Sequence, residues 1–126
     1  MNERFHLFVY GQLRRGGIGY RRLGLARRTR WMGRAIVRGR LHDLGAYPGL
    51  ILGGRGTVHG ELLAFDDPSL WALLDAYEDC DPERPALSEY RRVEVGLIGG
   101  GRAWAYEYVR PVRQKPVVAS GIWAPT

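Results

Sequence analysis

The chain has 126 residues, of which 45% are hydrophobic, and its 19 basic and 13 acidic residues give a formal net charge of +6. This length predicts a single small domain spanning residues 1–126, and the apolar fraction is too high for a disordered chain. No uncharged run is longer than that of residues 44–54, which is much shorter than the about 20 apolar residues of a membrane helix. The single cysteine indicates a reducing compartment, so we expect a cytoplasmic protein with no membrane partner.

The positive charge is concentrated near the N-terminus. Residues 1–40 contain 11 arginines and one acid, a balance of +10, whereas residues 41–126 carry 8 basic and 12 acidic residues, a balance of −4. A basic half of this kind is compatible with nucleic-acid binding. The arginines are scattered as singles and pairs instead of forming one basic run, so we predict no nucleic-acid partner and keep one only as an alternative.

The first predicted element is a strand over Phe5–Tyr10, which is rich in aromatic and β-branched residues. The glycines of Gly11–Gly19 then indicate a loop. Residues 20–31 have only a weak helical pattern, because Gly24 and the paired arginines interrupt it.

Two more strands are predicted in the middle of the chain, over residues 34–41 and 57–65. The first alternates small or apolar residues with arginines, and the second is flanked by glycines. Between them, Tyr47-Pro48-Gly49 predicts a turn.

A helix is predicted to follow these strands. Asp66-Asp67-Pro68 is typical of a capped helix start, and apolar residues follow at helical spacing at positions 70, 73, 74 and 77. We expect this helix to end near Asp79, because Pro82 lies shortly beyond it.

The last predicted strands, residues 90–97 and 102–109, are joined by Gly99-Gly100-Gly101 as a hairpin, and the segment from Pro111 onward is expected to be irregular. Trp104, Tyr106 and Tyr108 share one face of the second strand. Several strands with one clear helix and no regular β-α-β alternation predict an α+β fold.

Several common kinds of site do not fit the sequence. The glycines after the first strand lack the Lys-Ser/Thr ending of a phosphate loop, and His6, His42 and His59 have no metal-ligand spacing. Cys80 lies between two aspartates, whose charges are expected to raise the thiol pKa and make it a poor nucleophile. We therefore predict no metal site and no cofactor.

Glu78 is the strongest catalytic candidate. It follows Leu70 and Leu74 at four-residue spacing, so a carboxylate occupies the third step of an apolar helix stripe. Either the helix has ended and Glu78 reaches water, or the carboxylate is partly buried. In the second case, burial and the negative end of the helix dipole raise its pKa toward neutrality, which suits a general base and acid.

The segment Gly11-Gln12-Leu13 is the second candidate. Gly11 allows a sharp turn after the strand, and successive backbone N–H groups in such a turn form an anion-binding site. A plain connecting turn is the alternative. The neighbouring Arg14 and Arg15 add positive potential, or simply face solvent.

Taken together, these segments resemble the γ-glutamylcyclotransferase-like (AIG2-like) family, in small bacterial members. The loop sequence YGQLRRG resembles the family motif Y-G-[ST]-L-x-x-G. The other matching segments lie in the same order over nearly the whole chain: residues 39–50, 58–62, 74–78, 90–93, 104–108 and 120–123.

The resemblance implies a β-barrel-like mixed sheet with flanking helices, and an enzyme that acts on a small γ-glutamyl substrate. The free α-amine of the glutamyl group attacks its own γ-carbonyl and releases 5-oxoproline and an amine or amino acid. Glu78 is then the catalytic carboxylate. The implied substrate-binding residues are Tyr10, Gly11, Gln12 and Leu13, to which we add Tyr47, Tyr90 and Tyr108.

Gln12 departs from the family pattern, which has serine or threonine at this position. We expect activity to survive, because the implied contacts of this loop come mainly from its backbone. A non-catalytic module of the same fold that binds small anions is the alternative, and nucleic-acid binding through the basic N-terminal part is a further one.

Overall fold

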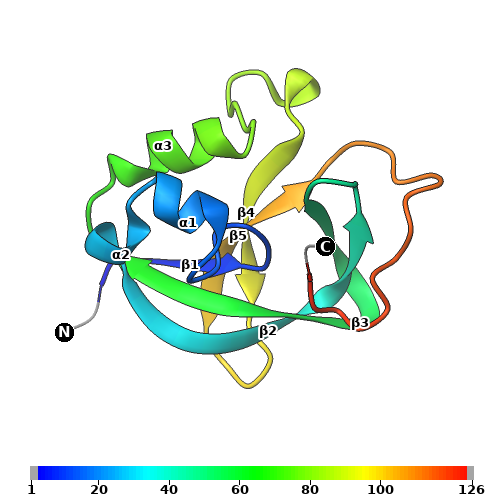
Figure 1. Cartoon of the computed structure of the whole chain (residues 1–126), viewed down its shortest axis with the longest axis horizontal. Coiled ribbons are helices and arrows are strands. Elements are labelled where there is room, and N and C mark those ends of the chain that lie inside the picture. The colour runs from blue at the N-terminus through cyan, green and yellow to red at the C-terminus, as the bar shows by residue number, and fades with distance from the viewer. Residues whose placement is uncertain (1–2, 125–126) are drawn as a thin grey trace.

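The computed structural model describes residues 3–124 and forms a five-stranded mixed sheet with three short α-helices (Figure 1). The strand order in the sheet is β2-β3-β1-β5-β4. In chain order the elements are β1 (Phe5–Val9), α1 (Ile18–Arg22), α2 (Leu25–Arg28), β2 (Arg30–Asp43), β3 (Pro48–Phe65), α3 (Leu70–Tyr77), the 3-10 helix η1 (Pro85–Leu87), β4 (Tyr90–Gly96) and β5 (Arg102–Tyr108).

The short strand β1 lies at the centre of the sheet, antiparallel to β3 and parallel to β5. The β2–β3 ribbon is long and strongly curved (Figure 1). Beyond the other edge, the Ile98 N–H of the β4–β5 turn donates to Ile36 O of β2 at 2.8 Å, so the two ends of the sheet approach each other. The expected α+β fold with a barrel-like mixed sheet is confirmed.

The turn predicted at Tyr47-Pro48-Gly49 was wrong by several residues. The β2–β3 turn lies at residues 44–47, where Leu44 N–H donates to Tyr47 O at 3.0 Å and Gly45 has a φ of 104°. Pro48 and Gly49 are instead the first residues of β3. Proline is tolerated at the first position of a strand, so a proline-glycine pair does not by itself mark a turn.

β3 also begins nine residues before the predicted position, Thr57. Its register against β2 jumps, because Gly39 pairs with Leu52 whereas Arg38 pairs with Thr57. The intervening residues 53–56 form a bulge in which Gly53 and Gly54 have φ values of 92° and 78°. Glycines that looked like the end of a strand therefore mark an irregularity within one long strand.

The weak helical pattern of residues 20–31 corresponds to two separate short helices, α1 and α2. Gly24 lies between them with a φ of 64°, a left-handed conformation that ends α1. Trp31, at the end of the predicted segment, already belongs to β2.

The predicted helix and hairpin are confirmed, but the predicted cap of the helix is not. α3 runs from Leu70 to Tyr77, and its N-cap residue is Ser69, which makes no side-chain cap hydrogen bond. The Asp67 carboxylate instead accepts a hydrogen bond from Ser69 N–H at 2.9 Å in the turn before the helix. Gly99, Gly100 and Gly101 all have positive φ in the β4–β5 turn. The segment after β5 contains no helix or strand within the described residues, apart from one isolated bridge to β2.

The core has two layers because side chains alternate along β1. Leu7 and Val9 pack on the side covered by the three helices, together with Leu74 of α3. Phe8 and Tyr10 point the other way, into the space enclosed by the curved sheet. Because β1 lies between these two layers, the loop that begins at Gly11 starts at the edge of both of them. There the loop contacts the end of α3.

Candidate active site

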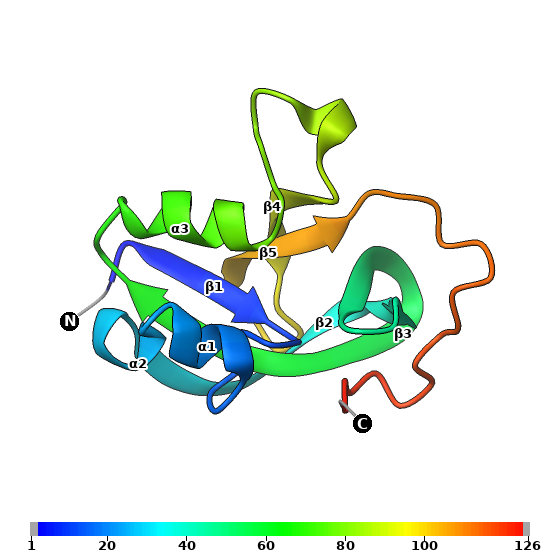
Figure 2. The same cartoon turned by 45° about the horizontal axis from the view of Figure 1, so that its top comes forward.

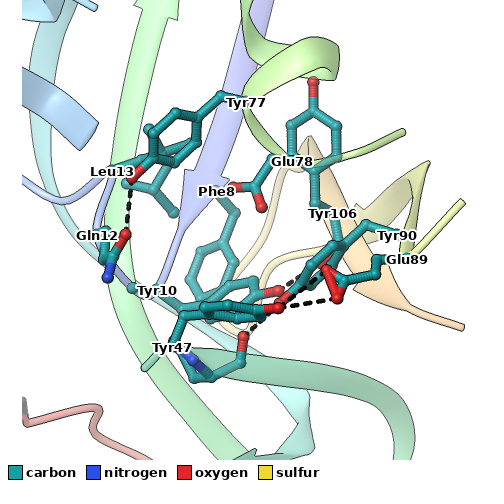
Figure 3. Close-up of a pocket in the computed structure, with 13 residues that line it drawn as sticks. Phe8, Tyr10, Gln12, Leu13, Tyr47, Tyr77, Glu78, Glu89, Tyr90 and Tyr106 are labelled. Atoms are coloured by element: carbon teal, nitrogen blue, oxygen red, sulfur yellow. Dashed lines mark hydrogen bonds between the residues drawn. The ribbon is translucent and has the colours of Figure 1, made fainter. Parts of the chain in front are cut away.

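A cavity of about 280 Å³ lies where five segments meet (Figure 3). It is lined by the end of β1 and the loop after it, the C-terminal end of α3, the start of β4, Tyr106 of β5, and the Tyr47-Pro48 junction that begins β3. The lining combines aromatic rings with two carboxylates, those of Glu78 and Glu89. A concave site of this size suits a small molecule.

The loop after β1 contains two backbone N–H groups that have no hydrogen-bond partner among the described residues. Gly11 O accepts from Arg14 N–H at 3.2 Å, and Gln12 O accepts from Gly19 N–H at 3.0 Å. The N–H of a trans peptide points opposite to its C=O, so the N–H groups of Gln12 and Leu13 point away from these partners. Neither donates a hydrogen bond within residues 3–124, and both residues line the cavity.

Glu78 continues the apolar stripe of α3, as predicted. Leu70 and Leu74 are fully buried, and Glu78 follows them as the C-cap residue, with its N–H donating to Leu74 O at 3.0 Å. Burial, and then the charge of Glu89, raise the pKa of the Glu78 carboxyl to about 8. The carboxylate points into the cavity and accepts no hydrogen bond from residues 3–124 (Figure 3).

Glu89 is the second carboxylate of the cavity. The Tyr47 hydroxyl donates to it, at 2.8 Å from one carboxylate oxygen and 3.1 Å from the other. This hydrogen bond raises the pKa of Tyr47 to about 12, so Tyr47 stays protonated. In the described part of the chain, Glu89 forms no ion pair, although the protein has an excess of basic residues.

The side chain of Gln12 links two sides of the cavity rim. Its Oε1 accepts from the Tyr77 hydroxyl at 2.7 Å (Figure 3). Its Nε2 donates to Ala46 O at 3.0 Å. Gln12 therefore ties the loop both to the end of α3 and to the β2–β3 turn. A serine or threonine is too short to make both contacts.

Three further tyrosines form the floor and wall of the cavity. Tyr10, Tyr90 and Tyr106 are all buried, and burial raises the pKa of each. Tyr10 donates to Tyr106 O at 2.6 Å, and Tyr90 donates to Pro48 O at 2.8 Å. These hydroxyls are neutral and fixed in direction, so they give the cavity a rigid wall.

Seven of the eight predicted site residues line this one cavity: Glu78, Tyr10, Gly11, Gln12, Leu13, Tyr47 and Tyr90. Tyr108 is the exception. Its ring packs edge-on against Tyr90, with centroids 5.3 Å apart, and it stands over Gly49 instead of lining the cavity. Tyr106, two residues earlier on the same face of β5, takes the position expected of Tyr108.

Glu89, Tyr77 and Tyr106 also line the cavity but were not predicted as site residues. Tyr106 could have been found, because it lies between Trp104 and Tyr108 on the aromatic face that the alternation of β5 indicated. Tyr77 could have been found as the neighbour of Glu78. Glu89 has no comparable signal, because it stands in a connection after an irregular segment.

Cys80 has a raised thiol pKa, as predicted, but for a different reason. Burial is the main cause and the charge of Asp75 comes next, whereas the sequence neighbours of Cys80 were expected to dominate. Residues 3–124 contain no cluster of three or more histidine, cysteine or acidic side chains that could hold a metal ion. Within the same residues, no helix is long and apolar enough to cross a membrane.

Comparison with known proteins bears on this site. Residues 7–125 match the profile of the family described as gamma-glutamyl cyclotransferase, AIG2-like. The chain is 36% identical over 126 residues to the gamma-glutamylcyclotransferase family protein YtfP of Citrobacter rodentium, covering 93% of both chains. It is also 36% identical over 124 residues to YtfP of Escherichia coli K12, covering 93% of this chain and 94% of that one.

Solved structures show the same fold. The solution structure of YtfP from Escherichia coli superposes with a TM-score of 0.67 at 33% identity, covering 94% of this chain and 96% of that one. The crystal structure of a mouse AIG2-like protein gives a TM-score of 0.74 at 22% identity, covering 98% and 90%. By sequence and by fold, the chain belongs to the gamma-glutamyl cyclotransferase, AIG2-like family.

Proposed function

We propose that this protein is a γ-glutamyl cyclotransferase that converts a small γ-glutamyl amide to 5-oxoproline and a free amine, with Glu78 as general base and acid. One observation carries the proposal. The unpartnered N–H groups of Gln12 and Leu13 and the carboxylate of Glu78 belong to one small cavity. This combination offers an anion-binding edge beside a group that can move a proton.

The reaction needs one proton carrier. Glu78 accepts a proton from the α-ammonium of the substrate, and the freed amine nitrogen attacks the γ-carbon to form the five-membered ring. As the tetrahedral intermediate collapses, the bond from the γ-carbon to the leaving nitrogen breaks, and Glu78 gives its proton to that nitrogen. The ring nitrogen, which became positively charged on attack, loses its second proton to Glu78, which passes it to the departing amine or to water, so that 5-oxoproline keeps one N–H. Because both reacting groups belong to one molecule, the enzyme mainly has to hold the chain folded.

The raised pKa of Glu78 supports this role. Burial in the cavity raises the pKa of the Glu78 carboxyl to about 8. This value is far closer to the pKa of an α-amine than that of an ordinary glutamate, so a proton moves between the two groups at a smaller cost in free energy.

The backbone donors of the loop supply the complementary charge. Two adjacent N–H groups can hold the α-carboxylate of the substrate, or the oxyanion that develops on the γ-carbonyl oxygen. They act here from a fixed loop, because the carbonyls of Gly11 and Gln12 are hydrogen-bonded on the opposite side.

The charge of the cavity favours some leaving groups over others. Glu78 and Glu89 both line it, and no arginine, lysine or histidine of the described residues does. A leaving group that carries its own carboxylate would be repelled by Glu89. We therefore expect neutral or ammonium-bearing amines to leave more readily than acidic ones.

The test is release of 5-oxoproline from a panel of γ-glutamyl amides whose leaving groups are neutral, cationic or acidic. We expect Glu78→Gln to lower kcat by about 10²–10⁴-fold, the usual contribution of a general base. Glu94→Gln is the matched control, because Glu94 is an exposed residue of β4 outside the cavity.

Undiminished turnover by Glu78→Gln would show that Glu78 is not the proton carrier. If 5-oxoproline binds but no member of the panel is converted, the protein is instead a binding module of the same fold.

A further inference from the structure

Arg14 lies behind the loop whose backbone faces the cavity. Its Nε donates to Gly11 O at 3.0 Å, and its Nη2 donates to Trp123 O at 2.7 Å. The side chain is half-buried and forms no ion pair with a carboxylate of residues 3–124. One guanidinium therefore joins the loop to the C-terminal segment through two backbone carbonyls.

The hydrogen bond from Arg14 to Gly11 O affects the neighbouring backbone donor, Gln12 N–H. Gly11 O belongs to the same peptide unit as Gln12 N–H, and it receives both the side chain and the backbone N–H of Arg14. Holding this carbonyl on the Arg14 side holds Gln12 N–H on the cavity side. A charged donor on the carbonyl also polarises the peptide, which makes its N–H a stronger donor.

The other end of the bridge is firmly anchored. Trp123 is only 6% exposed and packs in the inner core layer. The segment leading to it runs along the β2–β3 ribbon (Figure 2), where Val118 N–H donates to Leu41 O at 2.8 Å and His59 N–H donates to Gly121 O at 2.9 Å. Trp123 O is thus a fixed acceptor for Arg14.

We propose that Arg14 is a positioning residue of the active site, which acts through the Gly11–Gln12 peptide and takes its own position from the main chain of Trp123. The proposal rests on the proposed function, since it concerns the donors assigned to the substrate. It makes the C-terminal segment a part of the site, although none of the residues of this segment that the structure describes, up to Ala124, lines the cavity.

Arg14 is distinguished from a substrate contact by its place in the fold. It does not line the cavity but faces a second hollow on the outer side of the loop, together with Arg15 and Arg21. The guanidinium of Arg15 stacks 3.6 Å from the centre of the Trp31 ring and contacts no carbonyl of the loop. Arg15 therefore carries the same charge at nearly the same place, without the positioning contact.

The experiment compares Arg14→Ala, Arg14→Lys and the control Arg15→Ala. Binding of 5-oxoproline is followed by the backbone amide resonances of Gln12 and Leu13, and turnover is measured with the best amide of the panel. Thermal unfolding shows whether each variant is folded at the assay temperature. Arg14→Lys keeps the charge and the aliphatic part of the side chain, so it takes the place of Arg14→Ala in these measurements if the alanine variant does not fold.

We expect Arg14→Ala to weaken 5-oxoproline binding by about ten-fold or more, the effect of losing one charged hydrogen bond. The affinity of Arg14→Lys for 5-oxoproline is expected to lie between those of Arg14→Ala and the unsubstituted protein. The affinity of Arg15→Ala should stay within about two-fold of that of the unsubstituted protein. Millimolar guanidinium chloride, well below unfolding concentrations, should restore binding by Arg14→Ala, and sodium chloride at equal ionic strength should not.

The proposal is overturned if folded Arg14→Ala or Arg14→Lys binds 5-oxoproline as tightly as the unsubstituted protein does. It is also overturned if the Arg14 and Arg15 variants lose the same amount of affinity for 5-oxoproline, because the loss of a positive charge alone would then explain the effect. Failure of the proposed function looks different: the unsubstituted protein would produce no 5-oxoproline, while the loop amide resonances of Arg14→Ala would still shift from their normal positions.

Discussion

Glu78 and Glu89 line the same cavity, and the charge of Glu89 adds to burial in raising the pKa of Glu78. The two carboxylates differ in their partners. Glu89 accepts hydrogen bonds from Tyr47, whereas Glu78 accepts none from the described residues. The partnered carboxylate is thus held in place, and the unpartnered one is left free to exchange a proton.

This relationship predicts the pH dependence of the reaction. Because Glu78 must be ionised and the α-amine of the substrate must be protonated, kcat/KM should follow a bell-shaped pH profile, whose rising limb has a midpoint near 8 set by Glu78. Glu89→Gln removes the repulsion and should move the midpoint down by about 0.5–1 pH unit. The measurement is the pH profile of kcat/KM, with Glu94→Gln as the control. An identical midpoint in Glu89→Gln would mean that burial alone sets the pKa of Glu78.

The same pKa predicts a stability effect. The native state holds the Glu78 proton up to about pH 8, whereas the unfolded chain releases it near 4.5, so the native state binds more protons between these values. The free energy of unfolding therefore falls as pH rises across this window, and the loss is complete above pH 8. Glu78→Gln removes this titration, so it should be more stable than the unsubstituted protein at pH 9, by about 5 kcal/mol.

Urea unfolding of both proteins at pH 4 and pH 9 tests this prediction. The difference between them should be small at pH 4 and should favour Glu78→Gln at pH 9. A difference that does not depend on pH would show that the Glu78 carboxyl titrates normally.

Gln12 is expected to matter for stability more than for chemistry. Gln12→Ser removes the side-chain hydrogen bonds to Tyr77 and Ala46, at a cost of about 1–2 kcal/mol in the free energy of unfolding. It keeps the backbone N–H, so kcat/KM should stay within about ten-fold. Urea unfolding and 5-oxoproline release check the two parts separately, and Tyr77→Phe should reproduce part of the stability loss.

Gly60 is expected to be essential for the strand pairing beside the site. A Cβ at this position would collide with Val9 O and with the ring of Phe8, both fixed in β1. Gly60→Ala should therefore lower the free energy of unfolding by about 2 kcal/mol or more. Gly96→Ala is the matched control, since no atom lies within 4 Å of a Cβ there and its φ is not positive. Equal melting temperatures of the two variants would contradict this prediction.

The sequence correctly predicted those elements whose cause is local. The β4–β5 turn follows from three consecutive glycines, and α3 follows from its apolar spacing. The turn at Tyr47-Pro48-Gly49 failed because turn position also depends on register. Pairing with β2 places Gly45 in the turn and draws Pro48 into the strand.

The net charge of +6, prominent in the composition, says little about the site. Several arginines serve the fold itself: Arg14 binds backbone carbonyls, Arg15 stacks on Trp31, and Arg92 binds Asp75. The cavity is acidic even though the chain is basic. The absence of a nucleic-acid partner stays a prediction.

The sequence by itself determined the family, the α+β class and the place of Glu78 on the apolar face of α3, because each depends on residue order or on helical periodicity. Only the tertiary structure decided what surrounds Glu78. Glu89, Tyr77 and Tyr106 reach the cavity from different elements, and Arg14 meets Trp123 across more than a hundred residues. Such contacts depend on how the curved sheet packs, and periodicity along one element carries no information about the side chains of another.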